Sequence, residues 1–464
     1  FSSSAAGQAT IVCWSVGEGM CRVGGSGVLG CLVAQLTLAR VLCSEEAAEG
    51  SCSSLDGQCA AGAASGFASP PPLRWRGFPY KVSNPAFART IYGGEYIRAA
   101  FKERGFEGPV EGDDWDVLWT HRPQDSAFAR LPLPKRPGQR LVNHCTYFGG
   151  AGDKCGLARH TSRLRAAAAS GRRGHRYFRT YELDKPDQVA EWHQAVNERP
   201  RHYWLLKPCL GGASKGIRIA RGQEALDAAS TDFKGEKAVA QEYLHRPFLG
   251  FGGRKFHLRL YILVTRWAPV GAYLYNDGLV FRSLQPYSSN PGAHDVFSSI
   301  SASVEALPLV ALWQQLDALA AGPGSSRRRG RALPASAVRS RVAGLLRELL
   351  GSGLQESFGD YDAIERQRGA ACFDLFGADV ILDSGLRPML MEINSGPNMW
   401  ISDHGEAHMD TLAAVKRPLV RQMVQWASLR ARAERGSPGA AAAGEADQMA
   451  AEEAQSLVSF TRLL

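Results

Sequence analysis

Long apolar runs and paired metal-binding cysteines are both missing from this sequence of 464 residues. From residue 67 onward no uninterrupted stretch of about 18 apolar residues occurs, which excludes a polytopic membrane protein. The ten cysteines include no Cys-x-x-Cys pair, so no zinc site is predicted. No arrangement of Ser, His and Asp suggests a covalent protein nucleophile. With 45% hydrophobic and 21% charged residues, the chain is also unlike a wholly disordered protein.

An excess of basic residues indicates an anionic partner. Lys and Arg together number 54 against 45 Asp and Glu, which gives a formal net charge of +9. Such a surface attracts polyanions. Nucleic acid, anionic lipid and acidic protein tails all meet this condition, so the sign of the charge selects none of them.

Composition divides the chain into four segments. Residues 1–66 are rich in Gly, Ala, Ser and Cys. We interpret them as a low-complexity extension, disordered or mispredicted at the start of a fragment, with a targeting peptide as the alternative. Residues 67–200 are expected to form an N-terminal and central α/β lobe, 201–430 the main core and 431–464 a low-complexity tail.

Local patterns refine the first lobe. Residues 93–104 have a helical pattern, and residues 114–119 form a short apolar run of strand type. Helix followed by strand indicates an α/β lobe. An arginine-rich insert at residues 159–176 is expected to be a solvated loop, and binding of an acidic partner is the alternative.

A strand followed by glycines suggests a phosphate site. Residues 203–208 are of strand type and contain Lys207, and the glycine-rich segment 211–216 follows directly. Backbone N–H groups of such a turn can close over phosphate oxygens while a lysine supplies positive charge. The Walker order of residues is absent, so a glycine-rich hairpin with surface lysines is the alternative.

Residues 254–264 alternate between polar and apolar side chains. Lys255, His257, Arg259 and Tyr261 are expected on one face, and the intervening apolar residues on the other. Cations two residues apart on a strand repel each other unless an anion or solvent lies over them. A triphosphate is a natural occupant of this face, and a solvent-facing strand is the alternative.

A β-hairpin is predicted over residues 373–394, with its turn at residues 383–385. Folding about this turn brings Asp379 opposite Glu392 and places Asn394 on the same face as Glu392. Two facing carboxylates destabilise a hairpin unless a cation lies between them. Three oxygen-bearing side chains suit Mg²⁺, so we interpret the triad as a metal site rather than a chance surface cluster.

These segments, in this order, resemble the tubulin tyrosine ligase-like family. The resemblance extends over about residues 80–428. The segments that carry it are Leu141–His144, Trp204–Pro208, Ala238–Leu244, Arg254–Tyr261, Leu375–Asp379 and Met391–Asn398. The family has the ATP-grasp fold and joins amino acids to tubulin tails. The resemblance therefore implies an ATP-grasp α/β fold, with residues 201–430 as the ligase core and a smaller N-terminal α/β lobe.

The resemblance also implies a nucleotide site. Lys207 corresponds to a lysine that holds the α and β phosphates. The other expected nucleotide contacts are a flexible lid with Gly211, Gly212, Ser214, Lys215 and Gly216, an adenine hinge with Gln241, Glu242, Tyr243 and Leu244, and the strand residues Lys255, His257 and Arg259.

The expected metal ligands are Asp379, Glu392 and Asn394, and the expected catalytic residues are Lys255, Arg259, Arg282 and Glu392. In the implied reaction a carboxylate attacks the γ-phosphate of ATP, and an amine then converts the acyl phosphate to an amide. Preorganised positive charge would stabilise the negative charge that develops on the transferred group.

Two departures from the family pattern concern catalysis. The family has an aspartate at the position of His257. It also has an asparagine-containing segment after the equivalent of Tyr287, where this chain has residues 295–301 without asparagine. With an ordinary pKa of about 6.5, His257 would be charged only in mild acid.

The resulting prediction is a tubulin amino-acid ligase that uses ATP and Mg²⁺, with glutamate as the added residue. A weakened or inactive member that binds nucleotide and tubulin is the alternative, and a small-metabolite ATP-grasp enzyme is a third reading. Expected partners are acidic tubulin tails and a free amino acid, without nucleic acid or stable membrane insertion. We expect a monomer located in the cytoplasm, on microtubules or in cilia.

Overall fold

The computed structural model describes most of the chain beyond residue 70. The described residues are 71–77, 95–112, 114–120, 141–145, 153–169, 177–210, 216–267, 269–290, 304–322, 333–354, 371–399, 401, 407–436 and 456–464. They all belong to a compact unit that begins at Pro70. The expected extension at residues 1–66 lies outside the described residues. No helix in the described part is long and apolar enough to cross a membrane.

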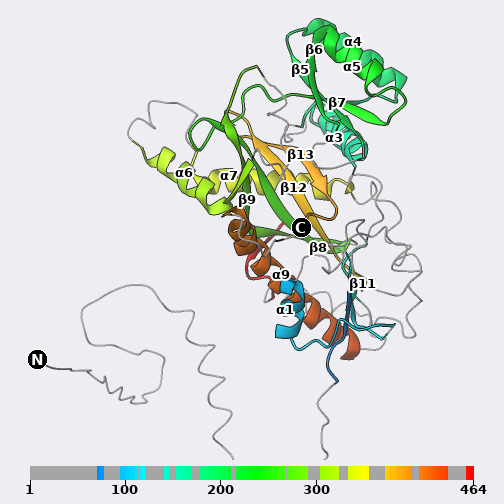
Figure 1. The fold of residues 1–464 in the computed structure, drawn as a ribbon, viewed down its shortest axis with the longest axis vertical. Coiled ribbons are helices and arrows are strands. Elements are labelled where there is room, and N and C mark those ends of the chain that lie inside the picture. The colour runs from blue at the N-terminus through cyan, green and yellow to red at the C-terminus, as the bar shows by residue number, and fades with distance from the viewer. Residues whose placement is uncertain are drawn as a thin grey trace, which may run out of the picture. The chain divides into compact units, whose positions relative to one another are not determined.

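A six-stranded antiparallel sheet forms the centre of this unit (Figure 1). Its order is β10 (Val304–Pro308), β9 (Val270–Pro286), β8 (Arg254–Trp267), β12 (Asp374–Leu382) and β13 (Pro388–Asn394), and β14 (Phe460–Arg462) also pairs with β9. The predicted hairpin is confirmed as β12 and β13, with Asp379 paired to Glu392. The Asp383 carboxylate closes its turn by accepting the N–H groups of Gly385 and Arg387 at 2.8 and 2.9 Å.

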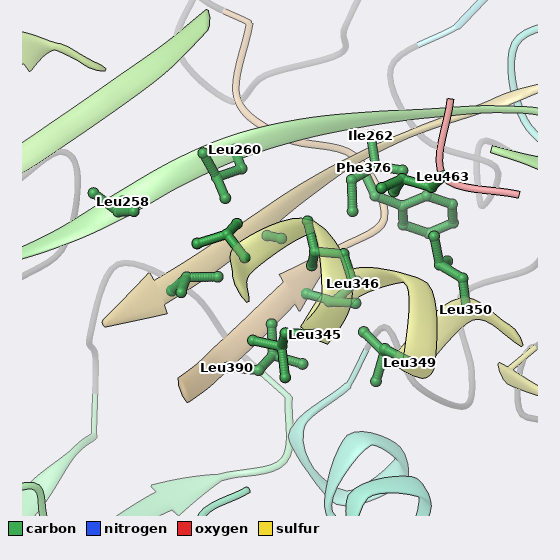
Figure 2. Close-up of a cluster of buried hydrophobic side chains, with 14 of the residues drawn as sticks. Leu258, Leu260, Ile262, Leu345, Leu346, Leu349, Leu350, Phe376, Leu390 and Leu463 are labelled. Atoms are coloured by element: carbon green, nitrogen blue, oxygen red, sulfur yellow. The ribbon is translucent and has the colours of Figure 1, made fainter. Parts of the chain in front are cut away.

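Helices cover both faces of this sheet. On one face, the apolar side chains of β8 pack against α7 (Ala335–Gly351), with α6 (Leu309–Ala321) beside it. Figure 2 shows Leu258, Leu260 and Ile262 together with the leucines of α7. On the other face, α9 (Ala407–Gly436) and α1 (Glu95–Glu103) form a second core that includes Tyr261 and Leu263. The predicted alternation is confirmed, but both faces of β8 are buried.

A small parallel sheet forms the N-terminal lobe. Its order is β1 (Trp75–Gly77), β2 (Val117–Trp119), β3 (Leu141–Val142) and β11 (Ala371–Cys372). The predicted helix and strand are confirmed as α1 and β2. Because β11 comes from residues 371–372, however, this lobe is not contained within residues 67–200.

A third, antiparallel sheet has the order β4 (Thr180–Glu182), β7 (Ala238–Glu242), β5 (Tyr203–Pro208) and β6 (Arg218–Arg221). The helices α4 (Pro186–Glu198) and α5 (Gly222–Thr231) pack on it, with Trp192 and Trp204 in their shared core. Since β4 pairs with β7, the expected division at residue 200 passes through one sheet.

Two other expectations differ from the structure. Residues 159–169 of the arginine-rich insert are not a loop but belong to helix α3 (Lys154–Ala169), in which Arg159 forms an ion pair with the buried Glu182. Residues 170–176 lie outside the described residues. The tail that was expected from residue 431 includes the end of α9 and strand β14, so its described parts belong to the fold.

Cysteines that are far apart in the sequence meet in two disulfides. Cys145 pairs with Cys372 at a Cα–Cα distance of 5.1 Å, and Cys155 pairs with Cys209 at 5.2 Å. The first disulfide joins the segment that follows β3 to strand β11, across a sequence separation of 227 residues. The second joins the start of α3 to the end of β5. Single scattered cysteines gave no sequence signal for either pairing.

Candidate functional site

Strands β8, β12 and β13 bring the predicted acidic and basic residues together. Asp379 on β12 pairs with Arg259 on one side and with Glu392 on the other. The Arg259 guanidinium donates two hydrogen bonds to the Asp379 carboxylate, at 2.5 and 2.9 Å. Burial alone would lower the pKa of Arg259, but the charge and hydrogen bonds of Asp379 raise it. Both side chains are buried, and their pairing offsets the cost of removing two charges from water.

A glycine makes room for this pair. A Cβ atom on Gly377 would lie 2.9 Å from Cβ of Pro397 and 3.2 Å from Cδ of Arg259. Any larger side chain would therefore push Arg259 away from Asp379 or displace the segment after β13. Gly377 lies two residues before Asp379, and its role was not evident from the sequence.

The carboxylates of Asp379 and Glu392 could hold a cation together with Asn394. The Asn394 amide donates a hydrogen bond of 3.4 Å to the Gly377 carbonyl oxygen. Burial raises the pKa of the Glu392 carboxyl; Lys154 opposes this rise and Asp379 adds to it. Among the described residues, no group of three or more His, Cys, Asp or Glu side chains is arranged for a metal ion. A metal here would therefore rely on two carboxylates and the Asn394 amide.

A cavity lies beside this acidic pair, between the third sheet and β13. Phe178, Val239, Leu390 and Met391 give it apolar walls, and Lys154, Lys207 and Gln241 give it polar ones. Its lining thus combines apolar side chains with charged and polar ones, as small-molecule sites do.

Lys207 and Gln241 both line this cavity. Lys207 Nζ donates a hydrogen bond of 2.6 Å to Gln241 Oε1. Burial lowers the pKa of Lys207 to about 8, and the nearby Glu392 partly opposes that shift. A bound anion would restore the charged form, since opposite charge favours protonation of an amine.

Sequence reasoning missed Lys154. It begins α3, lines the same cavity, and has its Nζ 3.8 Å from Glu392 Oε1. It precedes the arginine-rich insert at residues 159–176, and no pattern in the sequence singled it out.

The remaining hinge residues have different surroundings. The Glu242 side chain interacts with Arg199 at 3.1 Å and His202 at 3.5 Å, rather than lining the cavity. Tyr243 lies beneath Lys255, whose Nζ is 4.5 Å from the ring centre. Leu244 packs with Phe178, Ile381 and Met389.

Lys255, His257 and Arg259 share one buried face of β8, but Arg282 is not brought to it. Arg282 is paired with Phe256, whose side chain belongs to the opposite core. There it forms an ion pair with Glu305 and lies over the ring of Phe251. Because side chains alternate along β9, Phe281 rather than Arg282 shares the face of His257.

A further lysine, Lys416, was also missed. It lies on α9, is buried, and has its pKa lowered to about 7 by burial and by the charge of Arg259. The neighbouring Val415 and Leu419 belong to the second core. Lys416 thus extends the positive charge of β8 onto the helix that covers it. The signal in the sequence was a lysine at a helical position surrounded by apolar residues.

His257 is buried at the centre of the cationic face and packs against Phe281, with ring centres 5.4 Å apart. Burial lowers its pKa to about 4; Asp379 opposes this shift, and Arg259 and Lys255 add to it. The expectation of an ordinary pKa was therefore wrong, and His257 stays neutral well into mild acid.

Several predicted residues are not covered by the structure. Gly211, Gly212, Ser214 and Lys215 of the expected lid, and residues 295–301, lie outside the described residues. Gly216 is described and has a φ of 73°, a left-handed conformation that favours glycine.

A comparison with protein families identifies the family of this chain. The model of the tubulin-tyrosine ligase family matches residues 144–301 and 355–431, which is just over half of the chain. The chain belongs to the tubulin-tyrosine ligase family. Both matched ranges contain strands that carry the site.

Similar proteins carry more specific names. Tubulin monoglutamylase TTLL4 of Mus musculus is 24% identical over 343 residues, which cover 69% of this chain and 26% of that protein. Tubulin polyglutamylase TTLL6 of Homo sapiens is 24% identical over 66% of this chain and 33% of its own length. Probable tubulin polyglutamylase ttll-9 of Caenorhabditis elegans is 27% identical over 46% of this chain and 51% of its own length. The chain thus spans about a quarter to a half of these relatives.

The buried His257 predicts a specific dependence of stability on pH. Between pH 6.5 and 4 the unfolded chain protonates this histidine while the folded chain does not, so stability falls as the pH falls. His257→Gln should remove about 2 kcal/mol of the loss in unfolding free energy between pH 7 and pH 5. Urea unfolding at several pH values measures this, with the exposed His193→Gln as control. Equal pH dependence in wild type and His257→Gln would contradict the assignment.

Proposed function

We propose that this chain is an ATP- and Mg²⁺-dependent ligase with an ATP-grasp fold, which joins glutamate to the acidic tail of tubulin. The observation that carries the proposal is the facing pair Asp379 and Glu392 beside a cavity that contains Lys154 and Lys207. Two lysines in a partly apolar cavity, with a carboxylate pair next to one of them, suit a nucleotide whose phosphates are bound with a divalent cation.

In this proposal the apolar part of the cavity receives the adenine. Phe178, Leu390 and Met391 offer apolar contact to a planar base, and the Gln241 side chain offers a polar one. Lys154 and Lys207 would then receive the phosphates. Because Lys154 contacts Glu392, phosphates bound to Lys154 would lie close to a proposed metal ligand.

Asp379, Glu392 and Asn394 would hold Mg²⁺, and all three are oxygen donors of the kind this ion prefers. Bound there, the ion would neutralise charge on the phosphates and on the two carboxylates. Burial and the neighbouring Asp379 raise the pKa of Glu392, and a bound cation would oppose both effects.

Lys255 and Arg259 would act on the reacting groups. Both are buried on the face of β8 that adjoins Asp379, where positive charge is little weakened by water. The tail carboxylate would take the γ-phosphoryl group, and the amine of the incoming amino acid would then displace phosphate to form the amide. Fixed positive charge stabilises both steps without a protein nucleophile. Arg282 has no part in this proposal because it lies on the opposite face.

Lys416 would provide a site for a substrate carboxylate. It extends the positive charge of Arg259 toward α9, and a bound carboxylate would raise its pKa from about 7. The choice of glutamate rests on the relatives that are named tubulin monoglutamylase and polyglutamylase.

A catalytically weakened member that binds nucleotide and tubulin is the second candidate. Two observations favour it: His257 is neutral where the family has a carboxylate, and Arg282 is turned away from the site. Both residues are expected to act in the transfer step, whereas Lys207 and Gln241, which are expected to bind the nucleotide, line the cavity. Nucleotide binding and transfer are therefore to be measured separately.

Glu392→Gln should abolish Mg²⁺-dependent ATP turnover. The change is nearly isosteric, but it removes the charge that would hold the cation while leaving the hairpin paired. Phosphate release measures turnover, and the exposed Glu191→Gln serves as the control of matched chemistry. Turnover of Glu392→Gln close to that of wild type, with normal turnover in the control, would refute the metal assignment.

His257→Asp should raise ligase activity several-fold with little change in ATP affinity. An aspartate would place a negative charge between Lys255 and Arg259, which a neutral imidazole cannot supply. Incorporation of labelled glutamate into microtubules measures activity, and nucleotide titration measures affinity. The control is His193→Asp at an exposed position, which should leave activity unchanged. A fall in the activity of His257→Asp alone would identify His257 as an adapted part of the site.

Attraction to tubulin tails should depend on salt. Charges on a basic protein and an acidic tail are screened over about 8 Å at physiological ionic strength, so binding should weaken as salt rises. Sedimentation with microtubules measures binding, and microtubules whose tails have been removed with subtilisin provide the comparison. Undiminished binding to tail-less microtubules would show that another surface of tubulin is recognised.

A further inference from the structure

A second cavity lies on the third sheet, apart from the proposed nucleotide site. Its volume is about 380 Å³, and four of its five lining residues are Arg or His. The lining residues are Arg199, Pro200, Arg201, His202 and His245. Among the described residues, none lines both cavities. Gln241 lines the nucleotide cavity, whereas the next residue on β7, Glu242, contacts Arg199. Because neighbouring side chains of a strand point to opposite faces, the second cavity is a separate site.

A proline turn shapes this cavity. Helix α4 ends one residue before Arg199, and Pro200 cannot continue it. The N–H of His202 donates a hydrogen bond of 2.9 Å to the carbonyl oxygen of Arg199, which closes a β-turn with Pro200 at its second position. The start of α5 approaches this turn closely, since a Cβ atom on Gly222 would lie 3.1 Å from the carbonyl oxygen of Pro200. That approach brings Arg221, the residue before Gly222, to the side of the turn.

The arginines around this turn outnumber the carboxylates that pair with them. Arg199 donates a hydrogen bond of 3.1 Å to Glu242, and the same carboxylate lies 3.5 Å from the ring of His202. Arg201 and Arg221 are both exposed, and within the described part of the chain neither has an ion-pair partner. A single carboxylate therefore serves one of three arginines, and the other two are available to an anion.

Two more carboxylates lie near the turn in the sequence, but they do not pair with these arginines. Glu198 ends α4, is exposed, and accepts a hydrogen bond of 2.8 Å from Gln194 of the same helix. Glu224 is exposed in the first turn of α5, where a negative charge is favoured by the helix itself. The positive charge beside the cavity is therefore not neutralised by its own helices.

The two histidines are neutral near pH 7 and respond to an anion. Burial lowers the pKa of His202 to about 4; the charge of Glu242 opposes this shift. Burial also lowers the pKa of His245, and Glu242 again opposes the shift. A carboxylate that enters the cavity would act in the same direction as Glu242 and favour the charged imidazole. The site would thus gain positive charge when an anion binds.

The chemistry of the lining favours carboxylates over nucleic acid. The planar guanidinium of arginine pairs with a carboxylate through two parallel hydrogen bonds. Single-stranded nucleic acid is held mainly by exposed aromatic rings on which bases stack. Here Tyr203 is buried, and the guanidinium of Arg221 covers its ring at 4.9 Å from the centre. Glu242 would also repel a doubly charged phosphate more strongly than a singly charged carboxylate.

We propose that this cavity binds the carboxylate side chains of an acidic peptide segment. Arg199 and Arg201 would hold one carboxylate at the turn, and Arg221 would hold another further along the segment. For the ligase proposed above, the cavity would hold the acidic tail at a second point, away from the reacting carboxylate. That role rests on the proposed function, whereas peptide binding by itself does not.

The test measures binding of a fluorescein-labelled oligoglutamate peptide to the full chain by fluorescence anisotropy at low salt. Arg201→Glu reverses an exposed charge that has no ion-pair partner in the described structure, so the fold should be kept. This variant should bind the peptide several-fold more weakly and bind ATP as wild type does. Arg221→Gln should also weaken peptide binding. The control is Arg432→Glu, an equal charge reversal at an exposed position of α9, which should have little effect.

The outcomes separate this proposal from its alternatives. Equal peptide affinity in wild type and Arg201→Glu would overturn it, and so would an equal loss in Arg432→Glu, which would indicate attraction to net charge alone. Tighter binding of a single-stranded RNA of the same length, lost in Arg201→Glu, would assign the cavity to nucleic acid instead. If peptide binding depends on Arg201 but wild type does not bind ATP, the peptide site is upheld and the proposed nucleotide function fails.

Discussion

The buried ion pair between Arg259 and Asp379 is the interaction on which the candidate site depends. It holds the middle of the central sheet together across β8 and β12, and it orients Asp379 toward Glu392 on β13. Breaking a buried pair leaves an uncompensated charge, at a cost of about 3–5 kcal/mol. The close approach at Gly377 serves the same pair, because no side chain there would leave room for Arg259.

Around that pair the charges do not balance. The described part of the site gathers more cations than carboxylates: Lys154, Lys207, Lys255, Arg259 and Lys416 face only Asp379 and Glu392. Burial lowers the pKa of Lys207 and Lys416; Glu392 opposes the shift at Lys207, and Arg259 adds to the shift at Lys416. The anion proposed above would favour the charged forms of both lysines.

Local periodicity explains what could be predicted from the sequence. The pairing of Asp379 with Glu392 follows from one turn and a period of two, and the faces of β8 follow from alternation alone. The pairing of β11 with β3 and the meeting of Cys155 with Cys209 depend on contacts between distant segments, which no local pattern encodes. Arg282 was assigned from a motif, but a shift of one position on a strand reverses the face of a side chain. Lys154 was missed because it lies before the arginine-rich insert, in a part of the sequence that carries no motif.

The junction between β11 and β12 connects the N-terminal sheet to the central sheet. Only Phe373 separates a strand of the N-terminal sheet from a strand of the central sheet, and Phe373 packs against both Trp119 and Trp426. Cys145–Cys372 adds a covalent link at the same point. The N-terminal and central sheets are thus tied at one point by a one-residue connection, a disulfide and aromatic packing, so a substitution at Phe373 would disturb both sheets at once.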